Sequence, residues 1–312
     1  MQHTARRFML LGLVVALLLS LITPASAATP GGPGGPATVI CQFHKGAFPE
    51  SLAVDDDGTM YVSLGFEGRV VRIVEVDGIQ TYETYAQLNQ GQGLITGLAF
   101  DKDGNLYVGV ATFSTDPLPY IAKISSKGVW ETFAVLPVGS FPNGLAFDTA
   151  GSLYVSDSHS TTLYKFSADG ETRDIWLDSP LLAPNKGLGA NGLAFDKAGD
   201  MWIAVSNSGM ILQVHVSGGL PDGEPVVVKQ GEELKTADGI AFGPDGSLYV
   251  AVNRTNSLWV LGMNGSLERL ANRSDGLSYP TQPVISGGEL FLTNGALYNG
   301  TANLISLPLP TP

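Results

Sequence analysis

One phrase recurs along most of this chain and constrains its fold more than any other feature. In its clearest copy, residues 141–155 contain an apolar strand over 145–147, a tight turn at Ala150-Gly151 and a second strand over 153–155. A polar residue, Asn143, stands just before the first strand. Glycine at the turn supplies the positive φ that a two-residue hairpin requires. Each copy therefore predicts a β-hairpin that begins with a polar side chain.

Six copies of the phrase can be aligned, and the sixth is the most degraded. We call the polar residue that begins each copy its leading residue, and the six predicted leading residues are Glu50, Thr96, Asn143, Asn191, Asp238 and Gln282. Successive leading residues are 46, 47, 48, 47 and 44 positions apart. A repeat in the forties with paired strands is typical of a β-propeller blade. Alternating segments such as 69–73 and 79–85 supply the third and fourth strands.

The sequence predicts an all-β fold, a six-bladed β-propeller of four-stranded blades over residues 39–309. The sixth copy lacks an obvious outer strand after Ile305, whereas residues 39–43 form a strand with no blade of its own. We therefore expect this N-terminal strand to pair with the last blade and close the ring, which removes exposed strand edges. We also expect the aromatic residue in the second strand of each copy to pack between blades. These residues are Tyr61, Tyr107, Tyr154, Trp202, Tyr249 and Phe291.

The two ends of the chain are predicted to lie outside the propeller. Residues 1–28 contain two arginines, an apolar run over 8–22 and an Ala-Ser-Ala sequence, which is the pattern of a cleaved secretory signal peptide. The apolar run is shorter than the roughly 20 residues that span a bilayer. A Gly- and Pro-rich linker follows over 29–38, and residues 310–312 form a tail. We expect a secreted or periplasmic protein that has no membrane attachment after cleavage.

Charge and cysteine content narrow the classes of partner. The chain has 17 basic and 29 acidic residues, and its net charge of −12 becomes −14 when the two arginines of the leader are removed. This acidic field disfavours nucleic acids and anionic membranes, so small molecules and cations are the expected partners of a monomer. Cys41 is the only cysteine, which excludes an internal disulfide. No Cys/His cluster offers a zinc site.

The leading residues together suggest a metal site. The innermost strand of each propeller blade lines the central axis, so residues at the start of these strands converge at one end. Acid and amide oxygens suit a hard cation, and calcium accepts an irregular cage of 6–8 oxygens. Asn-Gly and Asp-Gly pairs also form turns. That role does not explain why an acid or an amide occupies the same position in four different repeats. We predict that Glu50, Asn143, Asn191 and Asp238 bind calcium or another divalent cation.

The order Glu, Asn, Asn, Asp across blades one, three, four and five resembles the six-bladed calcium-dependent hydrolase superfamily. Its members include the SMP-30/gluconolactonase proteins, the diisopropylfluorophosphatases and the paraoxonases. The resemblance covers the mature domain, and the Asn-Gly-Leu-Ala-Phe-Asp phrase at Asn191 looks closest to the gluconolactonase branch. It implies a catalytic calcium with Glu50, Asn191 and Asp238 as principal ligands. Asn143 would be a ligand or would touch the substrate.

The chain also departs from the family pattern. Ser51 follows Glu50 where the lactonases usually have Gly, and Gln282 stands where several relatives place a His near the metal. The arginine contacts that the family makes to sugar acids have no recognisable counterpart. The resemblance therefore implies the fold and the metal more strongly than it implies the substrate.

The expected reaction is hydrolysis of a small ester, with a lactone as the first candidate and an aryl or phosphate ester as the second. Calcium would polarise the carbonyl or phosphoryl oxygen, and Asn143 would help to stabilise the oxyanion. Attack would come from a calcium-activated water or from the Asp238 carboxylate, and the sequence leaves both routes open.

Four further residues are candidates for contacts with the substrate or with the metal ligands: Thr96, Gln282, Asp157 and His159. His159 would shuttle protons if its loop lies on the metal side, and is otherwise an exposed loop histidine. Asp157 would orient a metal ligand or make a hydrogen bond at the end of its strand. Two other functions stay open: a non-catalytic NHL-like propeller that binds a ligand or protein, and a lyase of the virginiamycin-inactivating type.

Overall fold

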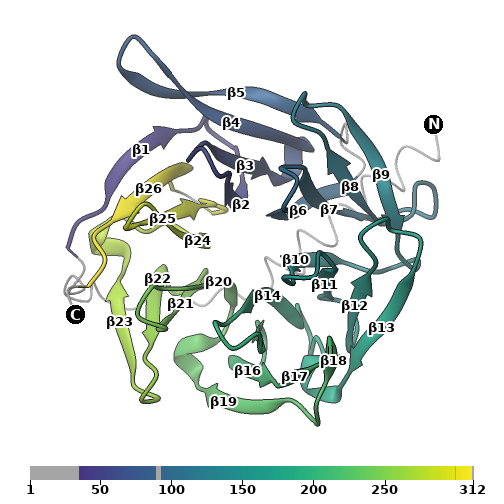
Figure 1. The fold of residues 1–312 in the computed structure, drawn as a ribbon. Coiled ribbons are helices and arrows are strands. Elements are labelled where there is room, and N and C mark those ends of the chain that lie inside the picture. The colour runs from purple at the N-terminus through teal and green to yellow at the C-terminus, as the bar shows by residue number, and fades with distance from the viewer. Residues whose placement is uncertain (1–34, 89–92, 299, 311–312) are drawn as a thin grey trace.

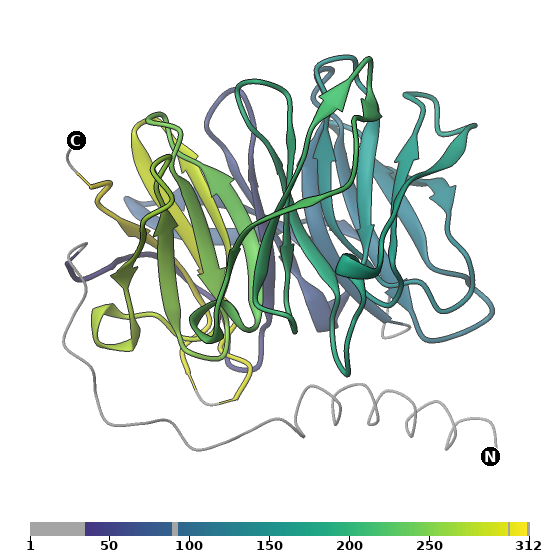
Figure 2. The same cartoon turned by 90° about the horizontal axis from the view of Figure 1, so that it is seen from below.

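The computed structural model describes residues 35–88, 93–298 and 300–310. Six four-stranded antiparallel sheets surround a central axis, and Figure 1 shows them as the blades of a propeller seen along that axis. The predicted fold class is thereby confirmed. The side view in Figure 2 shows the strands of all blades running across the thickness of one disc-shaped body. The predicted signal peptide and most of the predicted linker lie outside the described residues.

Each blade begins with its innermost strand. Blade 1 contains β2 (Pro49–Val54), β3 (Met60–Leu64), β4 (Arg69–Val76) and β5 (Ile79–Gln87). Blade 2 contains β6 (Gly93–Phe100), β7 (Leu106–Thr112), β8 (Tyr120–Ile124) and β9 (Trp130–Val135). Blade 3 contains β10 (Pro142–Phe147), β11 (Leu153–Asp157), β12 (Thr162–Phe166) and β13 (Arg173–Asp178).

The second half of the ring follows the same plan with one insertion. Blade 4 contains β14 (Ala190–Phe195), β15 (Met201–Val205), β16 (Met210–Val214) and β19 (Val226–Gln230), with a hairpin of β17 (Val216–Ser217) and β18 (Leu220–Pro221) inserted before its last strand. Blade 5 contains β20 (Ala237–Phe242), β21 (Leu248–Val252), β22 (Ser257–Leu261) and β23 (Leu267–Ala271). Blade 6 contains β24 (Pro280–Ser286), β25 (Glu289–Asn294), β26 (Asn303–Leu307) and β1 (Thr38–Gln42).

Helical structure in the described ranges is limited to short 3-10 turns. They are η1 (Gly65–Glu67), η2 (Pro180–Leu182), η3 (Glu232–Leu234) and η4 (Arg273–Asp275). None of the helices in these ranges has the length and apolar character needed to cross a membrane.

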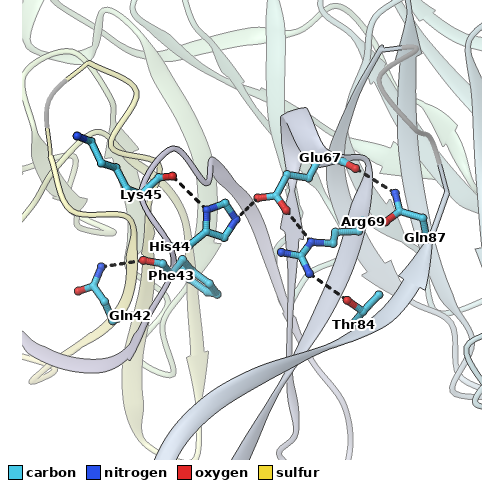
Figure 3. A network of polar contacts seen from close by, with 8 residues as sticks. All are labelled: Gln42, Phe43, His44, Lys45, Glu67, Arg69, Thr84 and Gln87. Atoms are coloured by element: carbon cyan, nitrogen blue, oxygen red, sulfur yellow. Dashed lines mark hydrogen bonds and ion pairs between the residues drawn. The ribbon is translucent and has the colours of Figure 1, made fainter.

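The N-terminal strand closes the ring as predicted. β1 pairs antiparallel with β26, so Val39 lies opposite Ile305, and Figure 1 shows the purple strand beside the yellow one. The chain then crosses into blade 1, where His44 Nε2 lies 2.7 Å from Glu67 Oε1 (Figure 3). The second oxygen of Glu67 accepts a 2.7 Å hydrogen bond from Arg69 Nε. The contact between His44 and Glu67 joins the crossing segment to blade 1.

The repeated aromatic residues pack between blades, as predicted. Tyr154 of blade 3 meets Phe195 of blade 4 edge-on at 5.1 Å, and its counterparts in blades 1, 2 and 4 make equivalent contacts with the next blade. The Tyr154 hydroxyl donates to Asp148 Oδ2 at 3.0 Å. Asp148 Oδ1 accepts from the backbone N–H groups of Ala150 and Ser152 in the hairpin turn. One carboxylate thus fixes both the turn and the aromatic side chain that joins the blades.

Candidate metal centre

The leading residues lie inside the innermost strands, at a bulge in each strand. We predicted that Asn143 precedes its strand, but β10 begins at Pro142 and includes it. Pro142 pairs with Asp157 and Leu145 pairs with Val155, so the two residues between them have no partner in β11. A β-bulge of this kind re-aims the side chains that it contains. The interruption explains why the phrase resembled a loop followed by a strand.

Glycines after the leading residues set the spacing between neighbouring innermost strands. A Cβ atom on Gly144 would lie 2.3 Å from the carbonyl oxygen of Asn191, and one on Gly192 would lie 2.4 Å from that of Asp238. Such distances exclude any side chain, so glycine lets the two backbones approach closely. The leading residues of blades 3, 4 and 5 therefore follow one another around the axis.

The pairing of blade 6 corrects one prediction. Pro280 pairs with Asn294 and Pro283 pairs with Leu292, so Thr281 occupies the leading position. Gln282, which we predicted there, takes the place that glycine holds in blades 2 to 5. The prediction failed because a bulge shifts the pairing register without changing the length of the repeat appreciably.

Ser51, the departure from glycine in blade 1, has a structural explanation. Its hydroxyl oxygen accepts a 3.1 Å hydrogen bond from the backbone N–H of Leu98 in blade 2. Its own N–H donates to Ser63 Oγ at 2.9 Å. Hydroxyl groups thus bridge the junction between blades 1 and 2. At the following junctions a glycine takes the place of Ser51, and the two strands approach closely because glycine has no side chain.

In blades 3 and 4, a serine hydroxyl fixes the orientation of the leading asparagine. Asn143 Nδ2 donates to Ser158 Oγ at 3.0 Å, and Ser158 Oγ donates to the carbonyl oxygen of Ala190 at 2.6 Å. Asn191 Nδ2 likewise donates to Ser206 Oγ at 3.0 Å, and that hydroxyl donates onward to blade 5. Because each serine uses its proton on a carbonyl, it can only accept from the asparagine. The amide nitrogen therefore faces the serine, and Oδ1 faces away from it.

Asn253 has the corresponding place in blade 5. Its Nδ2 donates to Asp238 Oδ2 at 2.8 Å and to the carbonyl oxygen of Pro280 at 2.6 Å. Ser158, Ser206 and Asn253 each follow their leading residue by fifteen positions. We call these three the supporting residues, because each joins a leading side chain to the backbone of the next blade.

The ionised carboxylates of Glu50 and Asp238 repel each other. Burial raises the pKa of Asp238 to about 7, against the lowering effect of hydrogen bonds from Asn253 and Asn191. Burial, and secondly the charge of Asp238, raise the pKa of Glu50 well above its ordinary value. In the part of the chain that the structure describes, neither carboxylate forms a salt bridge. Both ionised forms therefore lack a compensating positive charge from the described residues.

The donor set fits a hard cation that relies on amide as well as carboxylate oxygens. Among the described residues, Oδ1 of Asn143 and Oδ1 of Asn191 accept no hydrogen bond. These two oxygens and the carboxylates of Glu50 and Asp238 are the oxygen types that calcium prefers. No group of three or more His, Cys, Asp or Glu side chains with metal-binding placement occurs in the described residues. A softer ion such as zinc has no suitable ligand set in this ring.

The two threonines at leading positions and Gln282 donate hydrogen bonds that join neighbouring blades. Thr96 is fully buried, and its Oγ1 donates to the carbonyl oxygen of Pro142 at 2.8 Å. Thr281 Oγ1 makes the equivalent bond to the carbonyl oxygen of Pro49 at 3.1 Å. Gln282 Nε2 donates to the carbonyl oxygen of Ile240 in blade 5 at 3.4 Å and to that of Pro283 in its own strand at 2.9 Å. Thr96 and Thr281 are therefore matching positions on the two sides of blade 1.

Asp157 and His159 lie at the same end of the ring as the leading residues. Asp157 Oδ1 accepts backbone hydrogen bonds from Phe141 at 2.8 Å and from His159 at 3.1 Å, which is the strand-end role considered for it. His159 is exposed, and its ring lies 4.8 Å from that of Phe141. It follows Ser158 directly, so its loop is on the side of Asn143. Its Nδ1 lies 3.3 Å from the carbonyl oxygen of Gly139, and its ring makes no hydrogen bond with a leading residue in the described part of the chain.

The supporting residues were not identified from the sequence. Ser158, Ser206 and Asn253 are ordinary polar residues, and no shared motif links the three. The signal that could have found them is their constant offset of fifteen positions from Asn143, Asn191 and Asp238.

Two protein-family models match parts of the chain. Residues 95–220 match the model described as the SMP-30/gluconolactonase/LRE-like region. Residues 40–73 match the model of the strictosidine synthase-like N-terminal region. The propeller is thus SMP-30/gluconolactonase-like, as the sequence predicted. No curated protein matches the chain significantly.

Solved structures share the fold at low sequence identity. A gluconolactonase from Xanthomonas campestris is 16% identical, with 93% of this chain and 99% of that chain covered and a TM-score of 0.66. A luciferin-regenerating enzyme is 15% identical, with 88% and 95% covered and a TM-score of 0.67. A virginiamycin B lyase from Staphylococcus aureus is 17% identical, with 88% and 89% covered and a TM-score of 0.61. At these identities the likeness shows the fold alone.

Proposed function

We propose that this protein is a calcium-dependent hydrolase of a small-molecule ester, with a lactone as the first candidate substrate. One observation carries the proposal: the half-buried carboxylate of Glu50 and the buried carboxylate of Asp238 share one end of the ring with the unpartnered amide oxygens of Asn143 and Asn191. The match of residues 95–220 to the SMP-30/gluconolactonase/LRE-like model and the fold shared with a gluconolactonase support it.

Glu50, Asn143, Asn191 and Asp238 would hold the calcium. When bound, the ion polarises a carbonyl or phosphoryl oxygen as a Lewis acid. The supporting residues contribute by fixing the side chains before the substrate arrives, since Asn253 holds one oxygen of Asp238. Such preorganisation lets charge develop in the transition state without rearrangement of the site.

The protein groups leave two routes for hydrolysis. In one, a water oxygen attacks the acyl carbon while a nearby group accepts its proton. In the other, the Asp238 carboxylate attacks and water then cleaves the acyl-enzyme. Either way the acyl C–O bond breaks and the leaving oxygen receives a proton. Among the described residues, His159 hydrogen-bonds none of the leading residues, so the geometry assigns it no part in either route.

The proposal extends to the setting of the reaction. The substrate would be a small molecule, and nucleic acids and anionic membranes would be excluded by the acidic charge. The protein would act as a secreted or periplasmic monomer after removal of its leader.

A propeller lyase is the second candidate, because a virginiamycin B lyase shares the fold and His159 lies at the metal end of the ring. A lyase breaks its substrate by elimination and incorporates no water. Reaction in isotopically labelled water therefore separates the two: label in the acid product indicates hydrolysis, and an unsaturated product without label indicates elimination.

The test of the proposed function is turnover of a panel of lactones, aryl esters and phosphate esters by the mature protein. The panel is measured with calcium, with EDTA, and with calcium restored. We expect activity that EDTA abolishes and calcium restores, that Asp238→Ala lacks, and that the exposed control Asn264→Ala retains. Turnover that persists in EDTA or in Asp238→Ala would refute the proposal.

A further inference from the structure

Tyr279 is held in a strained conformation beside the ring. It directly precedes β24, and its φ of +56° lies in the left-handed region that a bulky residue rarely adopts. A conformation of this kind costs on the order of 1–3 kcal/mol and persists only where the surroundings enforce it. The strain therefore directs attention to what the side chain does.

The surrounding contacts enforce this backbone conformation. Tyr279 N–H donates to Asn256 Oδ1 at 2.7 Å, and the Tyr279 carbonyl accepts from Gly295 N–H at 2.8 Å. The next residue, Pro280, accepts from Asn253, which also holds Asp238. Tyr279 is thus joined to Asp238 through two residues, and its position is fixed independently of a ligand.

The phenol ring lies where blades 6 and 1 meet, at the end that carries the leading residues. It packs at 6.3 Å from the ring of Phe48, two positions before Glu50, and at 5.5 Å edge-on from Tyr298. Tyr279 keeps part of its surface exposed. Asn253 donates both to Asp238 and to the carbonyl oxygen of Pro280, the residue after Tyr279, so Tyr279 stands beside the ring of leading residues.

The Tyr279 hydroxyl is suited to donating a hydrogen bond. Burial and the charges around it raise the pKa of Tyr279 far above its ordinary value, so the phenol keeps its proton. Its present partner is the hydroxyl of Tyr298, which is itself partly exposed and lies near Arg254. A partner that also has surface exposure can move when a ligand offers a stronger acceptor.

From this placement we propose that Tyr279 is a ligand-contacting residue of the ring, and that its hydroxyl donates a hydrogen bond to the ligand oxygen on which negative charge develops. The inference rests on the proposed function for the identity of the ligand as an ester. The placement of the phenol beside the ring does not depend on the proposed function. In this arrangement Asn256 is a positioning residue, because it acts through the backbone of Tyr279.

The test compares Tyr279→Phe with Tyr85→Phe. Both variants lose one hydroxyl and keep the ring, and the Tyr85 hydroxyl bonds to Ser125 at a distant blade junction. Terbium is used first as a luminescent substitute for calcium. Tyr279→Phe should lose most of the tyrosine-sensitised terbium emission while the terbium affinity is kept, and Tyr85→Phe should retain both. Emission unchanged in Tyr279→Phe would overturn the inference whether or not an ester is hydrolysed.

Ester turnover then tests the donor role. Tyr279→Phe should lower kcat about 100-fold, as loss of one oxyanion donor does, with KM changed by no more than about threefold. Asn256→Ala should lower kcat less and leave KM unchanged. A wild-type kcat in Tyr279→Phe would overturn the donor role while the hydrolase proposal stands.

If the wild type hydrolyses no ester, the proposed function fails and the inference is decided by anion binding. Inorganic phosphate serves as the probe for calcium-loaded protein in a calorimetric titration. Tyr279→Phe should weaken phosphate binding about tenfold relative to Tyr85→Phe, because a hydrogen bond to a charged acceptor is lost. Equal phosphate affinity in the two variants would overturn it.

Discussion

The buried carboxylate of Asp238 should make the calcium-free protein less stable as the pH rises. Burial raises the pKa of Asp238 from 3.8 to about 7 in the folded state, even though Asn253 and Asn191 donate to it. The folded protein therefore holds this proton more tightly than the unfolded chain does. The stability that the proton contributes is present at low pH and is lost as the pH rises through about 7.

The size of this effect follows from the two pKa values of Asp238. Their separation corresponds to about 4 kcal/mol over the full titration, and about 2–3 kcal/mol of this is lost between about pH 5 and pH 8. Glu50 adds to the loss, because burial and the Asp238 charge also raise its pKa. Asp238→Asn removes the charge and keeps an oxygen for Asn253. Without calcium, the stability advantage of Asp238→Asn over wild type should therefore be about 2–3 kcal/mol larger at pH 8 than at pH 5.

Urea denaturation of wild type and Asp238→Asn at the two pH values, each in EDTA and in calcium, measures this difference. Calcium at about 100 times its dissociation constant should stabilise the wild type by about 2.7 kcal/mol at pH 8 and should have little effect on Asp238→Asn. Parallel stability profiles of the two proteins in EDTA would refute the reasoning, because they would mean that the Asp238 charge is already compensated or hydrated in the folded state.

Three further predictions concern the residues that hold the ring together. Asn253→Ala should weaken calcium binding about 10- to 100-fold by isothermal titration, because Asp238 loses one of its two donors, whereas the exposed control Asn264→Ala should not. Gly192→Ala should destabilise the protein by about 1–3 kcal/mol in urea, since its Cβ would meet a carbonyl oxygen of the next blade at 2.4 Å; an unchanged midpoint would contradict this. Tyr154→Phe should cost about 0.5–1.5 kcal/mol through loss of its hydrogen bond to the turn, with calcium affinity unaltered.

The sequence was sufficient to predict the six blades and the closure of the ring. Both follow from a repeat length and from hairpin turns, which are local properties of the chain. The closing strand was predictable because residues 39–43 had strand character and the sixth copy lacked an outer strand. Pairing of β1 with β26 needed no information on side-chain packing.

Register in blade 6 was not predictable from the repeat alone. The bulge leaves two residues of the innermost strand unpaired, and the hairpin turn that follows gives no information on where the bulge begins. A proline precedes the leading residue in blades 1 and 3, and Pro280 precedes Thr281 in the same way. That pattern, used as the alignment criterion, would have selected Thr281 in place of Gln282.

The position fifteen residues after the leading residue divides the ring into two chemically different parts. In blades 3, 4 and 5 it carries the supporting residues, whereas blades 1 and 2 have Gly65 and Ala111 there. In blade 6 the equivalent place, directly after the residue that pairs with the first proline of the strand, falls fourteen positions after Thr281 and is taken by Gly295. Phe48 fills the space beside both glycines, because a Cβ on either would lie within 2.9 Å of its ring. Asp238 lies in the polar part and has hydrogen-bond donors that favour its ionised form.

Glu50 lies in the apolar part, beyond the reach of the supporting residues. Burial and the neighbouring Asp238 charge act on it, and no hydrogen bond favours its ionised form among the causes that set its pKa. The two carboxylates of the ring are therefore not equivalent. In the calcium-free protein, burial and mutual repulsion favour retention of a proton by the pair until a cation compensates both charges.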